Sequence, residues 1–181
     1  IALIFGYNKY LKNTQAGPFT IAAARVMNVM LGTSASLNNI DSFPQFVILV
    51  FVLTITFVYV SLIGFISKYE VQGFSENIKL CLIPVIIAGI ISSIMLFTFI
   101  GFFKYESLII LVLFLFIMAK AVYRIQKKNS IGIQQCIQKM IMSIIVLDST
   151  YLSGTRGLEV GLAVLLLIAP LLILSRKMYM T

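Results

Sequence analysis

Histidine and tryptophan are absent from this chain, and cysteine and acidic residues are scarce. Its 181 residues include no His, no Trp, two Cys and six Asp or Glu. Without His, neither a Ser–His nor a Cys–His catalytic pair can form, and two Cys alone make a zinc site implausible. Cys81 and Cys136 both lie in apolar stretches, so we interpret them as free thiols. A disulfide-stabilised secreted module is therefore excluded.

Charge of either sign is also scarce, and this decides the class of protein. Charged residues make up 11% of the chain, whereas an ordinary soluble domain has about 25%. Hydrophobic residues make up 60%, and the mean hydropathy is +1.05. The 14 basic and six acidic residues cannot cover a soluble core of this size. The composition excludes a soluble globular domain and a disordered chain, and it predicts an all-α, polytopic transmembrane helical bundle.

Long apolar stretches predict where the chain crosses the membrane, because a crossing helix needs about 20 residues. Phe46–Ile66 and Leu80–Phe103 carry no charge and are long enough. The other predicted spans are Pro18 to about Ser36, Ser107 to about Tyr123, about Ile133 to Ser153, and Val160–Ser175. Ile1–Tyr7 is too short to cross, and we interpret it as the end of a helix that begins earlier. The prediction is about six full spans plus one truncated span.

Lys and Arg are distributed unevenly between the two sides of this predicted topology. One side has Lys104 and Arg156, and the other has Lys9, Lys12, Lys68, Lys79, Lys120, Arg124, Lys127, Lys128, Lys139, Arg176 and Lys177. Because basic residues favour the cytoplasmic side, segments 8–17, 67–79 and 124–139 and the C-terminus are expected there. The net charge of +8 therefore indicates membrane lipids, and no nucleic acid, as partner. We expect a multi-pass integral membrane protein of a bacterial inner membrane.

Lys120, Arg124 and Lys127 recur at i, i+4 and i+7, so they share one helix face. Two interpretations stay open for this face. The lysine and arginine stems snorkel to the membrane surface and control topology, or the cations contact an anionic lipid or a diphosphate.

Arg25 and Asn28 lie three residues apart inside the predicted span Pro18 to about Ser36, so they share a helix face, and Gly32 continues that face by one turn. Ionisable residues within a membrane are rare and commonly functional. A guanidinium matches phosphate geometry, so an anion contact is one interpretation of Arg25. The alternative is an arginine satisfied by helix-end carbonyls.

Three further positions each allow a functional and a structural interpretation. The Tyr7–Lys12 loop holds two lysines and two tyrosines, which suits a diphosphate or an interfacial aromatic and basic belt. Glu70 continues the face of Tyr59, Ile63 and Ile66, and it either ligates Mg²⁺ or pairs with Lys68 in solvent. Asp148 is either a structural hydrogen-bonded residue or a substrate contact.

Three segments taken together resemble the C-terminal half of the UbiA superfamily of intramembrane prenyltransferases. They are YNKYLKNTQAGPFTIAAARVMNVMLGTSA, YVSLIGFISKYEVQG and IVLDSTYLSG. The likeness is greatest to the EboC-like branch, in its R-x-x-N-x-x-x-G helix and its S-R-x-E-V-type loop. It spans most of the chain in order, so residues 1–181 are expected to be the C-terminal part of one UbiA-like domain.

The resemblance implies a bundle of about nine helices around a cavity that opens to lipid. It implies transfer of a prenyl group from an isoprenyl diphosphate to a lipophilic, aromatic-type acceptor, with Mg²⁺ as cofactor. Lys9, Lys12, Arg25 and Lys68 would then bind the diphosphate. Tyr7 and Asn28 would orient or polarise it, and Glu70 would bind the metal.

The chain departs from the family pattern at the second acidic motif. The family's D-x-x-x-D is replaced by Tyr69-Glu70-Val71-Gln72-Gly73, and Glu76 lies at the wrong spacing from Glu70. Two rival functions therefore stay open. One is a non-catalytic protein of the same fold that binds an isoprenoid lipid. The other is a small-solute transporter with Arg25, Asn28 and Asp148 along its path.

Overall fold

The computed structural model describes residues 11, 14–34, 43–72, 77–125 and 130–170. Within this part the chain forms helices and turns and no strands, which confirms the all-α prediction. The chain divides into two compact units, Ile1–Ser75 and Glu76–Thr181, and each is described by itself.

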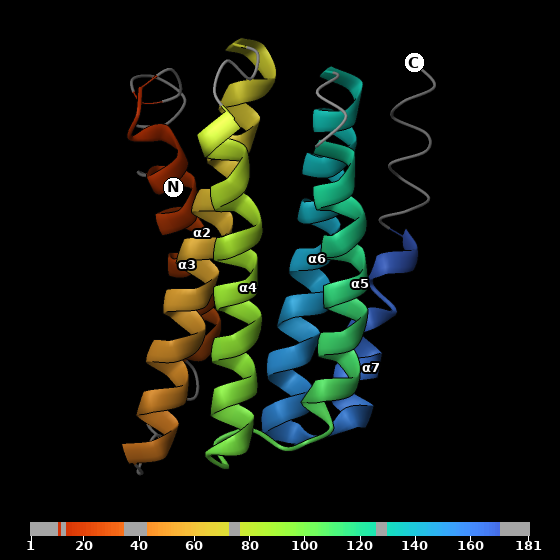
Figure 1. Ribbon diagram of the computed structural model, residues 1–181. Coiled ribbons are helices and arrows are strands. Elements are labelled where there is room, and N and C mark those ends of the chain that lie inside the picture. The colour runs from red at the N-terminus through yellow and green to blue at the C-terminus, as the bar shows by residue number, and fades with distance from the viewer. Residues whose placement is uncertain (1–10, 12–13, 35–42, 73–76, 126–129, 171–181) are drawn as a thin grey trace. The chain divides into compact units, whose positions relative to one another are not determined.

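The first unit contains two helices, α2 (Gly17–Ser34) and α3 (Phe43–Gln72), which lie side by side and antiparallel (Figure 1). Pro18 stands in the first turn of α2, where its missing N–H costs no helical hydrogen bond. Segment 67–72 was predicted to be part of a loop, and this is wrong because α3 continues to Gln72. Lys68 and Glu70 are therefore residues of a helix.

A close approach near Pro18 fixes the register of the α2–α3 pair. A Cβ atom added to Gly64 would lie 2.9 Å from both Cα and Cβ of Pro18, so only glycine allows this contact. The ring of Phe19 packs edge-on against Phe65 at 5.1 Å and stacks near Phe57 at 6.2 Å. The start of α2 therefore lies beside the C-terminal third of α3.

The second unit contains α4 (Asn77–Phe99), α5 (Ser107–Ile125), α6 (Ser130–Arg156) and α7 (Leu158–Leu165). α4 runs through Pro84 and ends in a tight turn at Gly101, whose φ is +92°. Gly101 N–H donates to Thr98 O and Phe102 N–H to Phe97 O, and the rings of Phe97 and Phe102 lie 5.2 Å apart. This is the Schellman arrangement, in which a left-handed glycine closes a helix.

α5 and α6 pack along almost their whole length as an antiparallel pair (Figure 1). One row of buried residues on α6 recurs at spacings of three and four, which is the heptad period of two helices wound around each other. The row consists of Ile133, Cys136, Met140, Ser143, Leu147 and Thr150. Val146, Ser149, Tyr151 and Ser153 on the same helix are buried as well. The buried positions Ser107, Leu111, Phe114, Met118 and Ala121 of α5 follow the same period. This contact is the core of the second unit.

α7 packs on α6 through small residues spaced four apart. Ser149 and Ser153 on α6 are followed by Gly157 and Gly161. A Cβ atom at Gly161 would lie 2.7 Å from Ser153 Cβ, 2.9 Å from Ile110 Cδ1 and 3.0 Å from Ser149 O. Small residues at such spacing allow helix backbones to approach closely in apolar surroundings. The Ser149 hydroxyl uses this proximity to donate to Gly161 O at 2.6 Å.

The helix bounds refine the predicted spans. The stretch Leu80–Phe103 is not one uninterrupted helix, because α4 ends at Phe99. Segment 124–139 is not all loop, because α6 begins at Ser130. By length and composition, one described helix, Phe43–Lys68, suffices to cross a membrane. Ile83–Phe99, Ser107–Tyr123 and Leu158–Pro170 are apolar but shorter. The number of crossings therefore stays a prediction.

Candidate functional site

Arg25 lies in the middle of α2, in accord with the prediction of a cation inside an apolar helix. Its residue is half-buried, and its Nε atom is fully buried. Asn28 and Gly32 share the helix face of Arg25, and both are exposed. A Cβ atom added to Gly32 would meet no atom of the described residues within 4 Å. The structure therefore leaves room on this face, beside the predicted anion-binding arginine.

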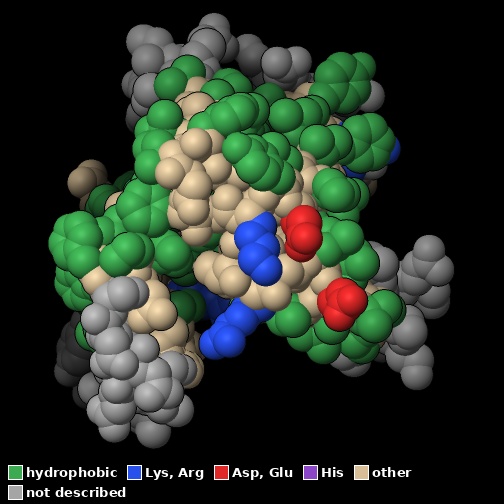
Figure 2. Space-filling model, turned by 90° about the horizontal axis from the view of Figure 1, so that it is seen from below, with side chains coloured by type: hydrophobic (Ala, Val, Ile, Leu, Met, Phe, Trp, Pro, Cys, Tyr) green, Lys and Arg blue, Asp and Glu red, His purple; other side chains and the backbone are tan. Residues whose placement is uncertain are grey.

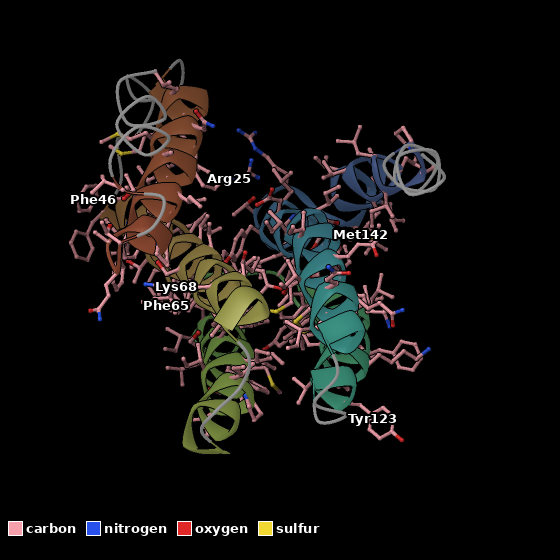
Figure 3. All side chains as sticks on the ribbon, turned by 90° about the horizontal axis from the view of Figure 1, so that it is seen from above. Arg25, Phe46, Phe65, Lys68, Tyr123 and Met142 are labelled. Carbon is pink, nitrogen blue, oxygen red and sulfur yellow. The ribbon has the colours of Figure 1, made fainter. Side chains whose placement is uncertain are left out.

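Lys68 lies at a different level of the first unit from Arg25. Lys68 is one turn beyond Gly64 on α3, and Phe65 and Lys68 leave that helix on the same side (Figure 3). Arg25 is two turns inward from Pro18, the residue that contacts Gly64. At 1.5 Å of rise per residue, the two backbones differ in level by about 16 Å. One compact phosphate group cannot contact both residues without long reaches by both side chains.

The position of Lys68 brings it near the chain that leads into α2. Thr14 N–H donates to Leu11 O at 3.0 Å, and Gly17 N–H donates to Thr14 O at 3.2 Å, so this segment turns directly into the helix. The predicted residues Tyr7, Lys9 and Lys12 lie outside the described residues.

The predicted metal site is not complete in the part of the chain that the structure describes. Glu70 lies on the last turn of α3, and its side chain is outside the description. The described residues contain no group of three or more Asp, Glu, His or Cys that could hold a metal ion. Mg²⁺ demands near-octahedral oxygen coordination, and one carboxylate supplies little of it. Mg²⁺ binding by Glu70 therefore stays a prediction that the described residues do not test.

The helices of the second unit place polar groups inside and apolar groups outside. Thr98, Ser107, Ser143, Ser149, Thr150 and Ser153 are fully buried. Most of these hydroxyls donate to a carbonyl three or four residues earlier, as Thr150 does to Val146 O at 2.8 Å. On the outer face of α5, by contrast, Ile109, Val112 and Phe116 are 63%, 67% and 55% exposed. Asp148 is half-buried on α6.

Two turns distant in sequence meet at one end of the second unit. Lys104 N–H, in the α4–α5 turn, donates to Gly154 O at 2.8 Å, and the Phe103 ring packs at 6.4 Å from that of Tyr151. The Glu106 carboxylate accepts the N–H of Leu158, the first residue of α7. Basic and acidic side chains gather on this face (Figure 2). A carboxylate suits a helix N-terminus because it satisfies an unpaired N–H and complements the helix dipole.

Removing the Glu106 carboxylate is expected to loosen the start of α7. Glu106→Ala deletes the acceptor of Leu158 N–H and is expected to lower stability by about 1 kcal/mol, as for lost helix caps. Faster hydrogen exchange at the Leu158 amide would show the effect locally. Glu159→Gln is the matched control, because it removes a carboxylate from the same helical turn without deleting that acceptor. Equal effects of both substitutions would contradict the assigned cap.

Searches of family models, curated proteins and solved structures found no match to this chain.

The α6–α7 contact was not predicted from the sequence, although the sequence contains a signal for it. The four-residue spacing of Ser149, Ser153, Gly157 and Gly161 is a repeated small-residue motif. Nothing local marked Glu106 as the cap of Leu158, since 52 residues separate them.

Proposed function

We propose that this chain is part of a multi-pass membrane protein that transfers a prenyl group from an isoprenyl diphosphate to a lipophilic acceptor. The membrane location is supported by one observation: α5 is apolar on both its buried and its exposed face. In water an exposed helix face is polar, whereas a helix that is apolar all round belongs in a core or a membrane. The buried hydroxyls and small-residue contacts of α6 and α7 are also typical of membrane helices.

The prenyltransferase part rests on the UbiA resemblance together with the position of Arg25. A guanidinium in the middle of an apolar helix is costly in lipid and is commonly retained for a ligand. Arg25 offers planar paired donors to a phosphate, and Asn28, one turn along, offers a neutral amide. The open space at Gly32 leaves room for a substrate beside them.

In the proposed reaction, the bond between C1 of the prenyl chain and the diphosphate oxygen breaks. The acceptor then bonds to C1 and loses a proton, and diphosphate leaves. Arg25 stabilises the negative charge that develops on the leaving diphosphate. Lys68, with Lys9 and Lys12, attracts the anionic substrate to the end of the unit where α2 begins. Tyr7 and Asn28 orient the diphosphate. Mg²⁺ binding by Glu70 stays a separate prediction, because the described residues do not complete a metal site.

The test uses the full-length protein that contains this chain, reconstituted in lipid nanodiscs, with farnesyl diphosphate as the probe. Binding is measured by equilibrium titration, and transfer is measured as release of diphosphate in the presence of an aromatic lipophilic acceptor, each with and without MgCl₂. The proposal expects saturable binding and acceptor-dependent release of diphosphate.

Three other outcomes separate the rival functions. Binding without release favours the non-catalytic isoprenoid-lipid protein. Absence of binding together with solute flux in proteoliposomes favours the transporter. A chain that stays in the aqueous phase and never enters vesicles overturns the membrane assignment itself.

A further inference from the structure

The two halves of the second unit differ in charge. All three acidic side chains described in this unit, Glu106, Asp148 and Glu159, lie in the half that contains the α4–α5 turn. Lys104 and Arg156 accompany them there. The sequence from 107 to 147 contains no acidic residue at all. Among the described residues, the opposite half, where α5 ends and α6 begins, holds the cations Lys120 and Lys139 and no acidic side chain.

Lys120, on α5, is an exposed cation of this half. Its Nζ lies 4.0 Å from the centroid of the Phe116 ring, one turn earlier. Tyr123, one turn later, is 64% exposed and projects away from the α5–α6 pair (Figure 3). A cation over an aromatic ring at an exposed site is held weakly. The ammonium group therefore remains available to a stronger, anionic partner.

The apolar stripe next to Lys120 indicates where that partner lies. Ile109, Val112 and Phe116 are exposed in a continuous row that leads along α5 to Lys120 and Tyr123. Lys120 lies about 20 Å from the start of α5 at Ser107, in a hydrocarbon layer of about 30 Å. Lysine stems reach from such a depth to the membrane surface, and tyrosine is enriched at the same level. Acyl chains along the stripe would place a lipid headgroup at Lys120.

We propose that Lys120 and Tyr123 bind the headgroup of an anionic glycerophospholipid whose acyl chains lie along the exposed face of α5. Lys120 Nζ pairs with the phosphate and leaves the Phe116 ring, and the Tyr123 hydroxyl donates to a headgroup oxygen. The opposite end of the unit does not select anionic lipid, because Glu106 and Glu159 offset Lys104 and Arg156 there. This inference rests on the proposed membrane location, and it is independent of prenyl transfer.

The test compares lipid association in vesicles of phosphatidylcholine with and without phosphatidylglycerol. Spin-labelled forms of the two lipids report how strongly each associates with the protein. The wild-type chain is expected to prefer phosphatidylglycerol. Lys120→Gln is expected to lower that preference about fivefold, since one basic residue near the surface contributes about that factor. Lys120→Arg retains the preference. Lys104→Gln, the matched control at the other end, leaves it unchanged.

Each contrary result has a distinct meaning. An unchanged preference in Lys120→Gln, or an equal loss in Lys104→Gln, overturns the site. Displacement of the preference by excess inorganic phosphate assigns Lys120 to free anions and not to lipid, which also overturns it. Failure of the chain to enter pure phosphatidylcholine vesicles is a different result, because it removes the membrane location on which the inference rests.

Discussion

Gly161→Leu is expected to separate α7 from α6. A single added carbon would already lie 2.7 Å from Ser153 Cβ and 3.0 Å from the backbone oxygen of Ser149. The serine backbone cannot move without disturbing α6, and the remaining leucine atoms have no space. Overpacking commonly costs about 1–3 kcal/mol and occasionally more, and leucine here is expected at the upper end. The Ser149–Gly161 hydrogen bond would be lost as well.

Thermal unfolding can be followed through Cys136, which is fully buried between α5 and α6. With Cys81→Ser as background, Cys136 is the one remaining thiol, and a maleimide dye reports its exposure on heating. Gly161→Ala is expected to lower the midpoint, and Gly161→Leu to lower it further.

Gly89→Ala is the matched control for these substitutions. A Cβ atom at Gly89 would meet nothing within 4 Å, and alanine is the better helix former. It is therefore expected to stabilise α4 by about 0.5–1 kcal/mol. Opposite signs for the two alanine substitutions support the close α6–α7 contact. Equal small effects at both positions would contradict it.

Arg25→Gln is expected to weaken binding of farnesyl diphosphate by about 10-fold to 100-fold. Hydrogen bonds to charged groups contribute about 1.5–3 kcal/mol, and glutamine keeps a donor but loses the positive charge. Arg25→Lys keeps the charge and loses the planar pair of donors, so its affinity is expected to lie between the two. Equilibrium titration in nanodiscs measures all three affinities.

The controls separate a binding role from a structural role. Arg156→Gln removes an exposed arginine from the second unit and is expected to leave the affinity unchanged. Hydrogen exchange at the amides of α2 is expected to be as slow in Arg25→Gln as in the unsubstituted chain, or slower, because a costly charge has left an apolar helix. Undiminished affinity in Arg25→Gln would refute the assigned role, and much faster exchange across α2 would make Arg25 a structural residue.

Predicted and observed helices agree best where one apolar stretch is long. α3 and α5 contain the predicted spans Phe46–Ile66 and Ser107–Tyr123 almost unchanged, because an apolar stretch of this length exceeds the length of a buried strand and indicates a helix. The ends were less predictable. Polar residues such as Lys68 were read as loop, yet they continue α3, because a helix extends beyond its apolar part when nothing in the sequence stops it.

The sequence could predict which residues form the candidate site, but it could not predict the distances between them. Arg25 and Asn28 could be placed on one helix face from their spacing alone. Their level relative to Lys68 depends on the contact of Pro18 with Gly64, which joins residues far apart in the chain. The exposure of one apolar face of α5 likewise required knowing which face α6 covers.

Composition and periodicity by themselves determined that this chain is helical and strongly apolar, because they depend only on residue type and local spacing. The tertiary structure alone decided that Glu106 caps Leu158 and that Gly161 fits against Ser153. These features arise where distant segments meet. The free energy of such contacts depends on positions that the whole fold sets, and no local pattern encodes them.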